Sequence, residues 1–106
     1  MTQKTSWLPH PTHGKLAKAQ KDALPESAFA FPTRRSLPLT DEGYVRKAIE
    51  DFTHVEDVSD EDRELAFANI QKAAQYYHVP MSERDWRQLG SRHLEPGYRR
   101  AERDRL

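Results

Sequence analysis

The sequence contains no cysteine and no long apolar run. The missing thiols exclude disulfide bonds, thiolate nucleophiles and cysteine-based zinc sites. The longest apolar stretch is about five residues, beginning at Ala28, whereas a membrane-spanning helix needs about 20. The first twenty residues also lack the apolar centre of a secretory signal. We therefore expect a cytoplasmic protein.

Patterns that carry catalysis or hold cofactors are also missing. The four glycines are scattered and form no phosphate-binding loop, and no nucleophile has a base at a recognisable spacing. His10 and His13 form an H-x-x-H without the further ligands that zinc needs. The acidic stretch 56–64 lacks the glycine turn of a calcium loop. We therefore expect no enzyme activity, no cofactor and no bound metal.

Charge of one sign does not dominate, because seventeen basic and seventeen acidic residues give a net charge of zero. The distribution is uneven: residues 1–39 carry +4, 40–65 carry −7, 66–90 carry +1 and 91–106 carry +2. A nucleic-acid-binding domain normally has a basic balance, since Lys and Arg displace counterions from phosphates. The acidic middle therefore argues against nucleic-acid binding without excluding a local basic face.

The length and composition predict one small domain with a thin core. We divide the chain into a flexible arm at residues 1–14, a small helical domain at residues 15–90 and a basic C-terminal tail at residues 91–106. Two large apolar residues of the arm, Trp7 and Leu8, are expected to be exposed or loosely folded back. The alternative is that they form a short docking motif.

Apolar residues at three- and four-residue spacing predict helices at residues 15–24, 41–52, 60–77 and 83–89. Thr40, Ser59 and Ser82 are the expected N-caps of the last three. The faces expected to turn inward are Leu16, Ala19, Gln20, Ala23 and Leu24 in the first helix, Tyr44, Val45, Ala48, Ile49 and Phe52 in the second, Ala66, Phe67, Ile70, Ala73, Ala74 and Tyr77 in the third, and Trp86 and Leu89 in the fourth.

Residues 27–39 alternate large and small apolar side chains before Pro32 interrupts the pattern. We expect an extended arm here rather than a paired strand, held to the helices by Phe29, Phe31, Leu37 and Leu39. The predicted fold is therefore mostly α: a small domain of three to four helices with an extended aromatic N-terminal arm and flexible basic ends.

Two places in the chain are candidates for recognition. Arg34 and Arg35 lie between two prolines, where burial of both charges is costly. We predict that they bind a partner; the alternative is that they pair with the acidic middle. Residues 60–89 also resemble a helix-turn-helix in outline. Its candidate nucleic-acid contacts, together with those of the tail, are Arg84, Arg87, Gln88, Arg92, Arg99 and Arg100.

The segments LPESAFAFP, Arg35, LPLTD and VRKAI, followed by VSDEDRELAFANIQKAA and SERDW, resemble a domain family of unassigned function. That family occurs in small bacterial proteins and in phage and prophage head-region proteins. Tyr44 stands where its pattern usually has histidine, and Lys47 where asparagine is common. The resemblance implies a helical assembly module, located in the virion if the gene is phage-encoded, and supplies no catalytic residues.

We therefore expect a non-enzymatic interaction or assembly module that binds a larger macromolecular partner, such as a protein of a virion or capsid. A small DNA-binding protein is the alternative. No membrane contact is expected.

Overall fold

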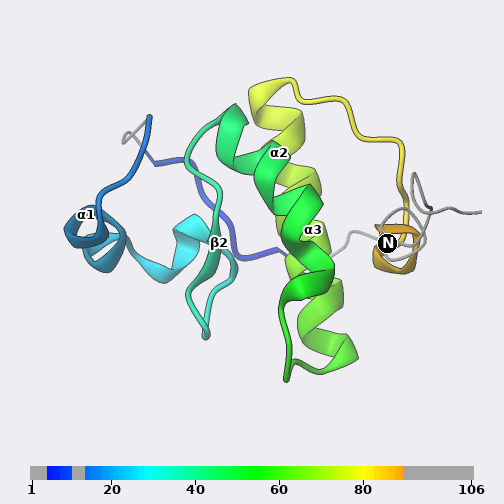
Figure 1. The fold of residues 1–106 in the computed structure, drawn as a ribbon. Coiled ribbons are helices and arrows are strands. Elements are labelled where there is room, and N and C mark those ends of the chain that lie inside the picture. The colour runs from blue at the N-terminus through cyan, green and yellow to red at the C-terminus, as the bar shows by residue number, and fades with distance from the viewer. Residues whose placement is uncertain (1–4, 11–13, 90–106) are drawn as a thin grey trace, which may run out of the picture.

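The computed structural model describes residues 5–10 and 14–89. Figure 1 shows the element order: α1 (Lys18–Ala23), the 3-10 turn η1 (Glu26–Ala28), β1 (Phe29–Phe31), β2 (Ser36–Pro38), α2 (Glu42–Asp51), the 3-10 turn η2 (Phe52–His54) and α3 (Asp60–Tyr77). Residues 86–89 are helical as well. The prediction of a small, mostly helical domain is confirmed, and the tail at 91–106 lies outside the described residues.

The segment expected to be an unpaired extended arm is instead a two-stranded antiparallel hairpin. Phe29 pairs with Pro38 and Phe31 with Ser36. Pro32 lies in the turn that joins the strands, where its fixed φ is compatible with the backbone, so it does not interrupt the ladder. The four expected anchors of this segment lie against the core, with Leu37 only partly buried.

The core lies where this hairpin meets the two longer helices. β1 packs against α3, β2 packs against α2, and α2 crosses in front of α3 (Figure 1). The inward faces predicted for α2 and α3 are buried, except for Tyr44 and Tyr77, which are half-buried. These contacts make the hairpin an integral layer of the domain.

Helix α2 begins one residue later than the sequence suggested. The expected N-cap, Thr40, is fully buried, and its carbonyl oxygen accepts a hydrogen bond from the Tyr77 hydroxyl at 2.8 Å. Asp41 is the N-cap: its Oδ1 accepts from the Tyr44 amide at 3.0 Å, while its Oδ2 accepts from the Gly14 amide at 2.8 Å. The carboxylate therefore caps α2 and also fixes the start of the segment before α1.

Helix α3 matches its predicted bounds and N-cap. The Ser59 hydroxyl accepts from the Asp62 amide at 3.0 Å, and the Asp62 carboxylate accepts from the Ser59 amide at 3.4 Å. This reciprocal pair satisfies two amides of the first turn. The helix ends at Tyr77, and the C-cap His78 has a left-handed backbone (φ 62°) that lets its amide donate to carbonyls of the last turn.

Helix α1 is shorter than expected, and no residue within it is buried. The prediction that Ala19 and Ala23 face the core is therefore wrong, because both are exposed. Leu16 and Leu24, just outside its two ends, are buried beside Ala28 and Phe29 in a second, smaller cluster. A six-residue helix is too short to be stable alone, so these flanking leucines hold it to the domain.

The expectation that Trp7 is exposed is wrong. Trp7 is 1% exposed, the largest of the fully buried side chains, whereas its neighbour Leu8 is 56% exposed. The segment 5–10 passes behind the hairpin and helices in Figure 1. Residues outside the predicted helical domain therefore contribute to the core.

The last helix is shorter at its N-terminal end than the predicted range 83–89. Residues 86–89 are helical, and Ser82 does not cap them. The Gln88 side chain instead accepts from the amides of Arg84 and Asp85. Leu89 is fully buried and Trp86 is partly buried against the core, as predicted.

Candidate functional site

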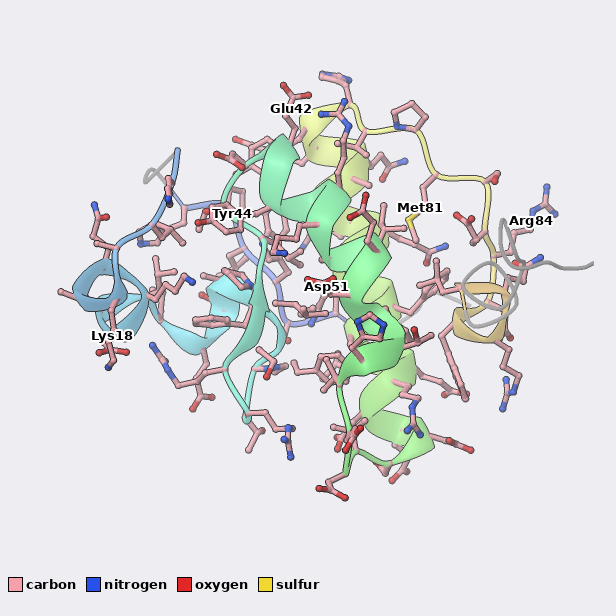
Figure 2. All side chains as sticks on the ribbon, in the orientation of Figure 1. Lys18, Glu42, Tyr44, Asp51, Met81 and Arg84 are labelled. Atoms are coloured by element: carbon pink, nitrogen blue, oxygen red, sulfur yellow. The ribbon has the colours of Figure 1, made fainter. Side chains whose placement is uncertain are left out.

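The arginine-bearing hairpin turn borders a surface groove of about 810 Å³, which we call the hairpin groove. Its walls come from the end of α1, the hairpin, the end of α2 and the connection that follows. Figure 2 shows one of its residues, Asp51, on α2. The lining residues are Lys21, Asp22, Phe29, Arg34, Arg35, Ser36, Leu37, Pro38, Asp51, His54, Val55, Glu56 and Asp57.

Arg35 has a structural role that the sequence did not reveal. Its Nη2 donates to the carbonyl oxygens of Lys21, Asp22 and Leu24 at 3.0, 3.1 and 2.7 Å. Its guanidinium also lies over the Phe29 ring, 4.8 Å from the centroid. Because the last carbonyls of a helix have no partner within it, this cation satisfies the end of α1 and opposes its negative dipole.

Arg34 makes fewer contacts than Arg35. Its Nη1 makes one long contact, 3.4 Å to the Asp57 carbonyl oxygen, and the side chain is exposed. It thus reaches the acidic segment, as the alternative interpretation expected, but at a backbone oxygen rather than a carboxylate. No ion pair within the described part of the chain involves Arg34. Its role in partner binding stays a prediction.

Charges of both signs line the hairpin groove. Two of its carboxylates already have cationic neighbours outside the groove, Lys18 for Asp22 at 3.1 Å and Lys47 for Asp51 at 3.2 Å. The remaining carboxylates belong to Glu56 and Asp57. A groove lined by four acidic and three basic residues suits a polar segment of mixed charge.

Left-handed backbone is concentrated around this groove. Among the described residues, the non-glycine positions with positive φ are Arg35 (54°), Leu37 (62°), Asp57 (59°) and His78 (62°). The first three line the hairpin groove. A left-handed conformation is unfavourable for a bulky side chain such as leucine, and such strain gathers at ligand clamps and switch regions.

The predicted nucleic-acid contacts are partly used within the fold. Arg87 lies over the Trp86 ring at 4.4 Å and bonds the Asp85 carboxylate, while Gln88 satisfies the two amides described above. Arg84 and Lys18 lie at opposite ends of the molecule in Figure 2. Arg92, Arg99 and Arg100 lie outside the described residues.

Sequence reasoning missed Asn69, a fully buried polar residue on α3. Its Oδ1 accepts from the amides of Ser6 and Trp7 at 2.8 and 3.0 Å, and its Nδ2 donates to the Ser6 hydroxyl and the Ala30 carbonyl at 3.1 and 2.9 Å. One signal was available. Asn69 lies between the inward residues Ala66 and Ile70 of a helical pattern, where a polar side chain needs a partner.

Tyr44, which stands where the resembling pattern usually has histidine, also has a structural role. Its hydroxyl accepts from the Leu16 amide at 2.8 Å, and its ring packs against the smaller cluster. In Figure 2 it lies on the side of α2 that faces the α1 end of the molecule. The contact ties the segment before α1 to α2.

Burial raises the pKa of the Tyr77 hydroxyl, with smaller contributions from Tyr76 and Asp41. A group of three or more His, Cys, Asp or Glu residues placed to hold a metal is not found among residues 5–10 and 14–89. Within the same residues, no helix has the length and apolarity to cross a bilayer.

Comparison with known proteins identifies one match. The model of a family of unknown function, DUF6582, matches residues 16–84, about two thirds of the chain. The matched range begins at the buried Leu16 and includes the whole hairpin groove, but it excludes Trp7. No curated protein and no solved structure shows significant similarity to the chain.

Proposed function

This chain belongs to the DUF6582 family, and we propose that it is a non-enzymatic interaction module whose hairpin groove binds a segment of a larger protein partner. The observation that carries the proposal is the clustering of left-handed residues. Arg35, Leu37 and Asp57 hold costly backbone conformations around one groove, although the chain has glycines elsewhere.

The groove favours an extended polar segment over a small apolar ligand. Its lining is largely charged, and the apolar part of it comes from Phe29, Leu37, Pro38 and Val55. Arg34 stands at the rim with a single long contact, which leaves its guanidinium suited to a carboxylate of the partner. Glu56 and Asp57 offer matching sites for a basic residue. The partner we propose is therefore a protein segment of mixed charge.

The assembly context follows from the resemblance to phage and prophage head-region proteins. We propose a virion or head-assembly component as the partner, with the protein located in the cytoplasm before assembly. The nucleic-acid alternative is less well supported, because residues 14–89 contain eleven basic and fourteen acidic residues, a net charge of −3. Phosphate binding depends mainly on a surplus of Lys and Arg.

The test is site-specific photo-crosslinking in the host cell. A photoreactive amino acid replaces Arg34 in one chain and Arg46 in another. Arg46 is a matched control, since it is an exposed arginine of α2 that pairs with Glu42 and does not line the groove. We expect a discrete protein adduct from position 34 that position 46 does not give. The same adducts from both positions, or none from position 34, contradict the proposal.

A second measurement separates the two function classes. The full chain is applied to immobilised duplex DNA at about 50 mM salt, where phosphate contacts are strong. The proposed function predicts that the chain is not retained. Retention that falls as salt rises, and that is lost on Arg84→Ala but not on Arg34→Ala, favours the DNA-binding alternative instead.

A further inference from the structure

The N-terminal segment is held by the domain in the way a receptor holds a peptide. Trp7 is buried between aromatic residues of α3, with ring centroids 5.7 Å from Tyr76 and 5.9 Å from Tyr77, both edge-on. Its indole Nε1 donates to the Leu39 carbonyl at 3.0 Å. The side chain therefore fills a specific slot with both apolar contacts and a hydrogen bond.

Four main-chain groups around Trp7 are also hydrogen-bonded to the rest of the domain. Asn69 accepts from the amides of residues 6 and 7, Lys72 Nζ donates to the Trp7 carbonyl at 2.9 Å, and the Leu8 amide donates to the Ser27 carbonyl at 3.0 Å. Contacts to backbone groups do not depend on the neighbouring side chains. The Leu8 side chain points out accordingly, at 56% exposure.

The slot lies within the residues that the family model matches, whereas the segment that fills it lies outside them. The groups that form the Trp7 slot are Ser27, Ala30, Leu39, Asn69, Lys72, Tyr76 and Tyr77, and all lie within residues 16–84. The segment that fills it lies outside that range. The family domain thus has a slot that its own matched sequence does not fill.

We propose that the Trp7 slot is a docking site for an extended tryptophan-bearing segment, and that its occupant in an assembled form is residues 5–10 of a second copy of this chain. The contacts come from residues 27–77, at least nineteen positions away from Leu8 along the chain. A second copy supplies the same atoms, so reciprocal exchange preserves each of these hydrogen bonds. Pro9, within the segment, favours the extended backbone that such an exchange needs.

This site is independent of the proposed function, because no residue of the Trp7 slot lines the hairpin groove. The first test restores the slot with a peptide. A synthetic peptide of residues 5–10, TSWLPH, is titrated into the full chain carrying Trp7→Ala, and thermal unfolding is followed by circular dichroism. We expect a lowered melting temperature that rises saturably with peptide, while TSALPH has no effect.

If the Trp7→Ala chain does not fold alone, the same titration reports folding induced by the peptide. Failure of TSWLPH to raise the melting temperature, or to induce folding, overturns the docking site. Asn69→Leu in the Trp7→Ala chain must also abolish the response, since it removes the side chain that binds the amides of Ser6 and Trp7. A response that survives Asn69→Leu overturns the assigned binding mode.

The second test identifies the occupant. The chain has no cysteine, so one can be placed in each of two populations: Leu8→Cys in the first and Ser27→Cys in the second. The mixed chains are treated with a short bismaleimide cross-linker. Exchange predicts a covalent heterodimer that increases with protein concentration. It must fall to the level of single-population controls when Trp7→Ala is added to the Leu8→Cys chain.

A heterodimer yield at control level at every concentration overturns the second copy as occupant. Together with a positive peptide titration, that yield means that the slot binds the segment but that each intact chain fills its own slot. Changing Arg34 leaves both readouts unchanged, so failure here is distinguishable from failure at the hairpin groove.

Discussion

At the scale of single residues, two fully buried polar side chains behave in opposite ways. Asn69 has partners for both its amide nitrogen and its carbonyl oxygen, whereas the Thr40 hydroxyl has none among the described residues. A buried hydroxyl without a hydrogen bond costs about 1–3 kcal/mol. A satisfied amide that bridges three segments stabilises the fold and fixes the position of Trp7.

Asn69→Leu should therefore destabilise the protein, whereas Thr40→Val should not. We expect Asn69→Leu to lower the free energy of unfolding by about 2–4 kcal/mol, because it leaves the Trp7 amide and the Ala30 carbonyl unpaired. Thr40→Val should leave it unchanged or raise it by about 1 kcal/mol. Urea unfolding measures both. Similar losses in the two variants contradict this assignment.

Ionisation of Tyr77 should lower the free energy of unfolding at alkaline pH. Burial raises its pKa in the folded state above the ordinary value of about 10, so folding favours the protonated hydroxyl. Its contribution is fully present below the unfolded-state pKa and is lost as the pH rises through the folded-state pKa. Tyr77→Phe should flatten the decline in unfolding free energy above about pH 10, although it loses the bond to the Thr40 carbonyl. An unchanged alkaline slope contradicts the prediction.

At the scale of secondary-structure elements, the chain contains two similar capping sequences with different outcomes. Ser59 and Asp62 form a reciprocal cap at the start of α3, but Ser82 does not cap the helical residues that begin at 86. We expect Ser59→Ala to cost about 1 kcal/mol in unfolding free energy. Ser82→Ala should change it by less than about 0.5 kcal/mol. Equal effects in chemical denaturation would refute the assigned caps.

The dependence of α1 on Arg35 gives a second prediction at this scale. Arg35→Ala removes the donor to three carbonyls at the end of α1, so the amides of α1 should exchange hydrogen about tenfold faster, which corresponds to about 1.4 kcal/mol of local stability. Arg34→Ala is the matched control and should leave that exchange unchanged. Equal protection of α1 in the Arg35→Ala and native chains contradicts the capping role.

At the scale of the whole molecule, the parts that were predictable from sequence are those fixed by local signals. The bounds of α3 follow from a capping pair and an uninterrupted apolar face, and the α2 face follows from the same periodicity. The hairpin was missed because its three-residue strands carry little pattern, and their pairing depends on a turn at Pro32. Burial of Trp7 was missed because its partner, Asn69, is 62 residues away.

The candidate site was predictable to a similar extent. The two prolines indicated that the arginines lie on a turn, but the sequence does not show which guanidinium is occupied. Arg35 is committed to α1 because the chain brings the two elements together, and this leaves Arg34 as the candidate for recognition. The left-handed backbone at Leu37 and Asp57 was not predictable either. Neither residue is a glycine, and the conformation depends on the folded hairpin and the connection.

The most direct test of the central claim is the affinity of the purified crosslinked partner for three forms of the full chain: native, Arg34→Ala and Arg46→Ala. We predict a dissociation constant at least about tenfold higher for Arg34→Ala, which corresponds to about 1.4 kcal/mol, and no change for Arg46→Ala. Equal affinities for all three forms, with their folds intact by circular dichroism, would show that the hairpin groove is not the binding surface.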